Sequence, residues 1–102
     1  MRGRFNPRAP LPIEVELLRE KASALRRLGH KLEQLIGELA RLEKELATAS
    51  GAARARHLAH YAALRTQAES ERWKMIVQRE AMGLSHHEDV DRSYPLPRVI
   101  VE

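Results

Sequence analysis

Leucine recurs every seven residues along the first half of this chain, and a second leucine line runs three residues behind the first. The first line is Leu18, Leu25, Leu32, Leu39 and Leu46, and the second is Leu28, Leu35 and Leu42. Apolar residues at both core positions of a heptad predict a long helix that packs against other helices. We expect it to span about residues 13–49, because Pro12 suits a first helical turn and Glu14 suits the helix N-terminus.

A second helix is predicted over about residues 52–82, between the breaker Thr48-Ala49-Ser50-Gly51 and Gly83. So short a connection makes the two helices antiparallel neighbours, and facing residue numbers then sum to about 101. In this register Trp73 is expected beside Gly29. The face of the second helix predicted to meet the leucines consists of Ala52, Ala55, Ala59, Ala63, Thr66, Ser70, Trp73 and Val77.

The two ends of the chain do not follow the helical pattern. Residues 1–12 form a basic arm with three prolines, and residues 84–102 form an irregular or extended tail. Tyr94-Pro95-Leu96-Pro97 cannot be helical, because proline lacks the backbone donor and restricts the residue before it. The predicted organisation is therefore an arm (1–12), an all-α antiparallel helical hairpin (13–83) and a tail (84–102).

The apolar stripe of the first helix is wider than a two-stranded seam, because Val15, Ala22, Gly29 and Ile36 extend it on one side. One hairpin buries only one stripe per helix, so further apolar residues need cover. We therefore predict a homodimer in which two hairpins form a four-helix bundle. The expected oligomer interface consists of Val15, Ile36, Leu58, Tyr61, Leu64 and Met75.

Composition narrows the possible classes of protein. A chain of 102 residues is enough for one small domain, and the absence of cysteine excludes disulfides, thiolate metal sites and cysteine nucleophiles. No apolar run approaches the roughly 20 residues of a membrane span. The basic, proline-containing start has no apolar segment of the signal-peptide type. We expect a soluble, cytoplasmic protein.

Basic charge is concentrated in two places. The net charge is +4, with an excess of three arginines in residues 1–12 and of three basic groups in residues 50–83, whereas residues 84–102 carry two more acids than bases. A doubled basic surface in a dimer could bind phosphates, although GC-rich coding alone also enriches arginine. The candidate nucleic-acid-binding residues are Arg2, Arg4, Arg8, Arg54, Arg65, Arg72 and Arg79.

Metal binding and catalysis have little support in the sequence. His86-His87-Glu88-Asp89-Val90-Asp91 is rich in ligand side chains, but adjacent residues on a short loop seldom converge on one ion. The pair His57 and His60 is equally compatible with a helix surface. There is no phosphate loop, nucleophile elbow or di-iron Glu-x-x-His pair. We therefore predict a non-enzymatic protein with no metal and no cofactor.

The tail is the most apolar irregular stretch, and its extended form costs little ordering entropy on binding. It either binds another protein, folds back on its own bundle or pairs with the same segment of a second copy. Its candidate partner-binding residues are Tyr94, Leu96, Val99, Ile100 and Val101. The function expected is that of a helical assembly, scaffold or adaptor module acting through protein–protein interaction. The alternative is a small dimeric nucleic-acid-binding protein.

Overall fold

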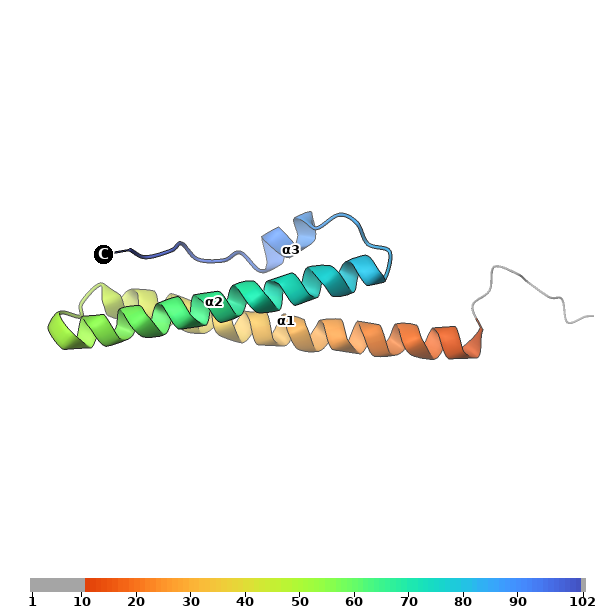
Figure 1. Ribbon diagram of the computed structural model, residues 1–102, viewed down its shortest axis with the longest axis horizontal. Coiled ribbons are helices and arrows are strands. Elements are labelled where there is room, and N and C mark those ends of the chain that lie inside the picture. The colour runs from red at the N-terminus through yellow and green to blue at the C-terminus, as the bar shows by residue number, and fades with distance from the viewer. Residues whose placement is uncertain (1–10, 102) are drawn as a thin grey trace, which may run out of the picture.

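A computed structural model describes residues 11–101 of the chain, and these form a helical hairpin with a short third helix (Figure 1). Helix α1 spans Pro12–Leu46, α2 spans Gly51–Ala81 and α3 spans Glu88–Ser93. The described residues contain no strand. The predicted all-α helical hairpin is therefore confirmed.

The helix ends follow from local chemistry. Pro12 begins α1, and the Glu14 carboxylate accepts a hydrogen bond from the backbone N–H of Leu11 at 3.2 Å. Helix α1 ends three residues earlier than predicted, at Leu46, whose carbonyl accepts a hydrogen bond from the Arg54 guanidinium. Both the bond and the positive charge suit the C-terminus of a helix.

The predicted glycine cap at the end of α2 is confirmed. Gly83 has a φ of 86°, a left-handed conformation that favours glycine. The Leu84 N–H donates to the carbonyl of Arg79 and the Gly83 N–H to the carbonyl of Glu80, both at 3.0 Å. This pair of bonds is the Schellman motif, which satisfies the last carbonyls of the helix and turns the chain back along it.

Leucines of α1 form the core. Leu32 and Leu39 are fully buried, and they pack in one cluster with Tyr61, Ala68 and other residues. The register agrees with the prediction, because Lys31 Nζ lies 3.0 Å from a Glu71 carboxylate oxygen, a pair whose numbers sum to 102. Antiparallel packing of long helices around a leucine seam thus accounts for the hairpin.

The predicted inward face of α2 is wrong. Trp73 is 65% exposed and Val77 is 46% exposed, whereas Tyr61 and Met75 are buried against α1. Both faces of α2 carry side chains at heptad spacing. The face with the larger buried side chains packs on the leucines because it removes more apolar area from water.

The tail, residues 84–101, folds back along the hairpin (Figure 1). It contains α3, whose Val90 is 2% exposed, followed by an extended segment that runs antiparallel to α2 toward the turn between α1 and α2. Of the alternatives predicted for the tail, the structure of the single chain shows the folded-back one. Tyr94, and not Trp73, is the large side chain beside Gly29.

The first turns of α1 extend past the end of α2 (Figure 1). Ile13 is 68% exposed there, and Leu17 and Leu18 are about half exposed, at 50% and 46%. The heptad line therefore continues beyond the part of α1 that α2 covers. Across residues 11–101, none of the helices combines the length and apolar character needed to cross a membrane.

Candidate interaction surfaces

The predicted arginine row of α2 holds the chain's own tail. Arg65 Nε donates to the carbonyl of Pro97 at 2.7 Å, and its Nη1 lies 3.0 Å from Glu69. Arg72 forms an ion pair with Asp91. Arg79 donates to the carbonyl of His86 at 2.9 Å and to the His87 ring at 3.4 Å.

The nucleic-acid alternative also names Arg54 and three arginines of the N-terminal arm. Arg54 bonds the end of α1, as described above. Arg2, Arg4 and Arg8 lie outside the described residues. Within residues 11–101, the arginine row of α2 therefore makes contacts inside the chain. These contacts favour a role in holding the tail over a role in binding phosphate.

The tail is also held through its backbone by Tyr61. The Tyr61 hydroxyl donates to the carbonyl of Arg98 at 2.7 Å, and the Arg98 guanidinium lies 3.3 Å from Glu43 of α1. Burial raises the pKa of Tyr61, and the nearby Glu43 carboxylate raises it further, against smaller opposing effects of Arg65 and Arg98. The neutral, donating hydroxyl is the form that this site favours.

The predicted partner-binding residues of the tail divide into two groups. Tyr94, Leu96 and Ile100 pack against the hairpin core, whereas Val99 and Val101 are 61% and 81% exposed. Apolar contact therefore fastens the tail to its own chain on one side and leaves two valines outward on the other.

The sequence carries a signal for this arrangement in the opposite charges of the tail and the second helix. The tail region carries a net charge of −2 and the second-helix region a net charge of +3, and Arg65, Arg72 and Arg79 are spaced by seven residues on one helix face. Opposite charge on two segments joined by a short turn favours their pairing. This reading would have placed the arginines against the tail.

The predicted inward face of α2 forms an exposed surface, which we call the outward seam. Every member is exposed, and none is charged. On a helical wheel it lies about 140° from both the α1-facing side and the tail-facing side. The outward seam consists of Ala52, Ala55, Ala59, Ala63, Thr66, Ser70, Trp73 and Val77.

Most residues predicted for an oligomer interface lie inside the single chain. Tyr61 is 1% exposed and Met75 is 4% exposed, and Leu58 and Leu64 pack against the same core. The prediction that these four remain uncovered in one hairpin is wrong, because α1 and the tail cover them. Val15 and Ile36 are half-buried.

Glu71 is a buried carboxylate between the two long helices. It is 4% exposed, and its Oε1 lies 3.0 Å from Lys31 Nζ and 3.3 Å from Lys74 Nζ. The hydrogen bond from Lys31 lowers the pKa of Glu71, helped by Lys74 and opposed by burial. Since both lysines are about half exposed, at 49% and 58%, this is a structural ion cluster at the edge of the core.

The histidine-rich segment makes structural contacts. His87 Nε2 lies 3.4 Å from Glu80, and its Nδ1 accepts the bond from Arg79. Within residues 11–101, no three His, Asp or Glu side chains come together in a way that could hold a metal ion.

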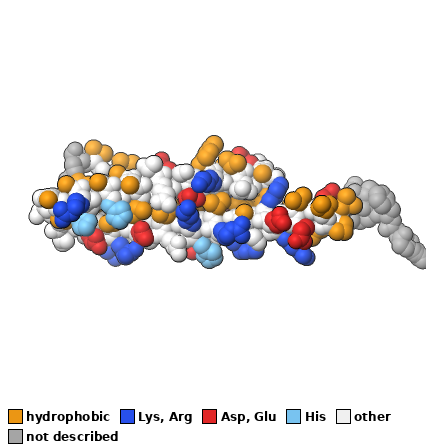
Figure 2. Space-filling model, turned by 60° about the horizontal axis from the view of Figure 1, so that its bottom comes forward, with side chains coloured by type: hydrophobic (Ala, Val, Ile, Leu, Met, Phe, Trp, Pro, Cys, Tyr) orange, Lys and Arg blue, Asp and Glu red, His pale blue; other side chains and the backbone are white. Residues whose placement is uncertain are grey.

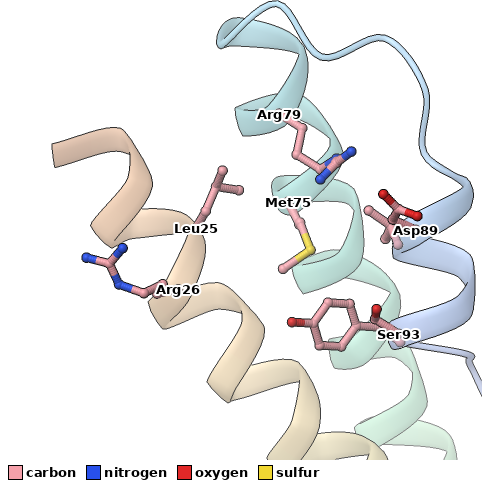
Figure 3. Close-up of a pocket in the computed structure, with 8 residues that line it drawn as sticks. Leu25, Arg26, Met75, Arg79, Asp89 and Ser93 are labelled. Carbon is pink, nitrogen blue, oxygen red and sulfur yellow. The ribbon is translucent and has the colours of Figure 1, made fainter. Parts of the chain in front are cut away.

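A hollow of about 280 Å³ lies where α1, α2 and α3 meet. Leu25 and Met75 point into it from the two long helices, and Asp89 and Ser93 lie on the α3 side (Figure 3). Two of its charged groups already bond within the chain, Asp89 to Arg92 and Arg79 to the His86 carbonyl. The hollow offers space lined with apolar atoms but no arrangement of nucleophile and base.

The surface shown in Figure 2 has mixed charge along the hairpin, with apolar side chains gathered over the first turns of α1. Basic and acidic groups alternate there and form no broad patch of one sign. Such a surface is typical of a solvated helix face rather than of a phosphate-binding one.

Comparison with known protein families, with curated proteins and with solved structures found no match to this chain. The class that the fold and surfaces define is a helical hairpin closed by its own tail.

Proposed function

We propose that this chain is a non-enzymatic helical assembly module that pairs with a second copy through the outward seam of α2, giving a dimer in which the two α2 helices pack between the two α1 helices. One observation carries the proposal: a heptad-spaced, uncharged helix face with Trp73 65% exposed has no partner within the described chain. An exposed apolar helix face with this periodicity is typical of helix–helix interfaces.

The gradient of side-chain size along the outward seam favours an antiparallel pair. The side chains are small near the turn and large near the open end of the hairpin. Antiparallel copies therefore place large residues on small ones. With facing numbers that sum to 136, Trp73 meets the partner's Ala63, Val77 meets Ala59, and Ser70 meets Thr66. A parallel pair would instead place Trp73 on Trp73 and leave gaps between alanines.

Charge supports the same register. At the ends of the outward seam, Glu80 faces the partner's Arg56 in this alignment, and both side chains are exposed. Glu69 lies close to its own copy, one residue from the centre of the pair, but its charge is already paired with Arg65 at 3.0 Å. The flanking charges therefore permit the antiparallel register and favour it at both ends.

The size of the outward seam sets the expected strength. A helix face about 38 Å long and about 10 Å wide buries on the order of 800 Å² over both copies. Stable interfaces bury about 1,200–2,000 Å², so we expect a dimer that dissociates at micromolar concentrations.

Sedimentation equilibrium over about 1–500 μM tests the proposal, with the emission of the single tryptophan as a second readout. We expect association to a dimer and a blue shift of Trp73 emission as the concentration rises. Ala63→Glu should abolish both, because it places a charge opposite Trp73 without an intrachain clash.

Ala40→Glu is the matched control, since Ala40 is also an exposed helical alanine but lies on α1, away from the outward seam. It should leave the dimer intact. A chain that stays monomeric at 500 μM, or a dimer that Ala63→Glu does not weaken, contradicts the proposal.

Nucleic-acid binding is the less supported function. Arg65, Arg72 and Arg79 bond to the tail, so a phosphate backbone would have to displace those contacts. Anisotropy with a random DNA duplex from about 50 to 300 mM salt distinguishes the two functions, since phosphate binding gives a steep negative salt slope.

A further inference from the structure

We propose that the groove holding the tail is a binding site for an extended, proline-containing peptide from a partner protein, and that the tail occupies it as an internal competitor. This inference does not depend on dimerisation, because the groove and the outward seam lie on different sides of α2. We call this surface the tail groove. Its residues are Gly29 and Glu43 of α1 with Tyr61, Arg65, Arg72 and Arg79 of α2.

The hydrogen bonds of the tail groove recognise backbone more than side chains. Tyr61, Arg65 and Arg79 each donate to a main-chain carbonyl, of Arg98, Pro97 and His86 respectively, at 2.7–2.9 Å. Every residue of a peptide offers such a carbonyl. A proline-containing segment suits these donors, because it lacks some backbone N–H groups and is already extended before it binds.

Apolar positions supply the selectivity. Tyr94, Leu96 and Ile100 pack on the hairpin core. A Cβ added at Gly29 would lie 2.6 Å from the Tyr94 hydroxyl, so glycine provides the space for an aromatic ring there. A partner peptide is therefore expected to carry an aromatic residue, then apolar residues two and six positions later, with proline between them.

The tail fills its groove incompletely. The hollow of about 280 Å³ lies at the Val90 and Tyr94 end, and another of about 150 Å³ lies at the far end, lined by Tyr61, Arg65 and Ile100 among others. Both hollows are open to solvent, so side chains larger than those of the tail can enter them. A peptide with larger side chains at these two places would make contacts that the tail does not.

The ion pair that also holds the tail is weak enough for a partner peptide to displace it. The Arg98–Glu43 ion pair is 73% and 38% exposed on its two side chains, and exposed pairs add little stability. The tail's advantage is that it is tethered, which gives it an effective concentration in the millimolar range. A partner peptide must overcome this advantage through better packing.

The test uses the full-length chain and a fluorescein-labelled peptide with the sequence of residues 88–101, followed by anisotropy. The Leu96→Ala/Ile100→Ala chain has a weakened tail and an unaltered groove. We expect it to bind the probe at least about tenfold more tightly than the natural chain, because the apparent Kd falls as the open fraction rises. Asp91→Ala, which removes the Arg72 ion pair without touching the core, should act in the same direction.

Two matched variants test the site itself. Adding Tyr61→Phe to the weakened-tail chain should reduce probe affinity several-fold, because it removes the donor to the peptide carbonyl. A probe with phenylalanine in place of Ile100 should bind more tightly than the natural sequence, because it fills the 150 Å³ hollow.

Circular dichroism confirms that each chain variant retains its helices. Absence of probe binding to both weakened-tail variants at about 1 mM overturns the proposal, as does equal binding of a scrambled probe. Equal affinity of the natural and phenylalanine probes overturns the part that concerns incomplete packing.

Discussion

Two faces of α2 have the same spacing but opposite surroundings. The inward face buries Tyr61 and Met75 against the α1 leucines, whereas the outward seam leaves Trp73 65% exposed. Both repeat at heptad intervals, so periodicity alone assigns either one to the core. The comparison teaches that spacing identifies packing faces, whereas side-chain volume decides which face meets a given neighbour.

The inward face also carries charge, which sequence reasoning normally assigns to solvent. Glu71 is buried there, and Lys31 and Lys74 reach it from partly exposed positions. A buried carboxylate is tolerated when it is paired and hydrogen-bonded. The outward seam is uncharged from Ala59 to Val77, except at its flanks, and yet is exposed to water. Polarity alone would therefore predict the wrong face of α2 as the buried one.

The largest expected effect comes from removing one aromatic ring from each face. Tyr61→Ala should lower the free energy of unfolding by about 3–5 kcal/mol, because it empties a buried site and removes a tail contact. Trp73→Ala should change it by no more than about 0.5 kcal/mol, since Trp73 is exposed. Urea unfolding at low micromolar concentration, where dimerisation does not contribute, makes the comparison. Equal losses would show that the two faces have been assigned wrongly.

Glu71→Gln tests the charge on the inward face. Removal of the carboxylate should lower the free energy of unfolding at pH 7 by about 1.5–3 kcal/mol, as expected for hydrogen bonds to a charged group. The native pKa is lowered, so this contribution is present above the ordinary glutamate pKa of about 4.3 and disappears as pH falls through the lowered value.

Unfolding midpoints from pH 7 to pH 2 measure this effect. The natural chain should lose stability on acidification, and the Glu71→Gln chain should lose less. Glu33→Gln is the control, since the Glu33 side chain is 64% exposed and makes a weak contact, at 3.9 Å, with a ring nitrogen of His30. Parallel pH curves for the natural and Glu71→Gln chains would contradict the role of the ion cluster.

The smallest effect compares two glycines of α1. Gly37→Ala should raise the free energy of unfolding by up to about 1 kcal/mol, because alanine favours helix and an added Cβ meets nothing within 4 Å. Gly29→Ala should give no such gain, because its Cβ would displace the Tyr94 hydroxyl. Combining Gly29→Ala with Tyr94→Phe should recover part of the gain in thermal unfolding. Equal gains at the two glycines would show that Tyr94 does not lie over α1.

Much of the fold was predictable from local rules. The leucine lines defined α1, the breaker before Gly51 and the cap at Gly83 bounded α2, and the short turn set a register that Lys31 and Glu71 confirm. These features depend on residues close in sequence or on simple antiparallel geometry. They need no knowledge of which side of α2 faces inward.

The site was harder to predict, because it depends on a segment that has no periodicity. Val90 and Tyr94 pack on the hairpin from an irregular tail, and their contacts join residues far apart in sequence. The spacing of the arginines predicts a row on one helix face, but it does not show whether their partner is a phosphate or the chain's own tail. Charge complementarity between the tail and α2 favours the tail.

The direction in which the tail returns has a mechanical consequence. Pro12 begins α1 at the open end of the hairpin, and the tail runs from that end toward the turn (Figure 1). Tension between the two chain ends would therefore slide the tail lengthwise along α2, so that the bonds from Arg79, Arg65 and Tyr61 bear the load together. The tail is fastened in shear, whereas a transverse pull on the C-terminus alone would peel it away one bond at a time.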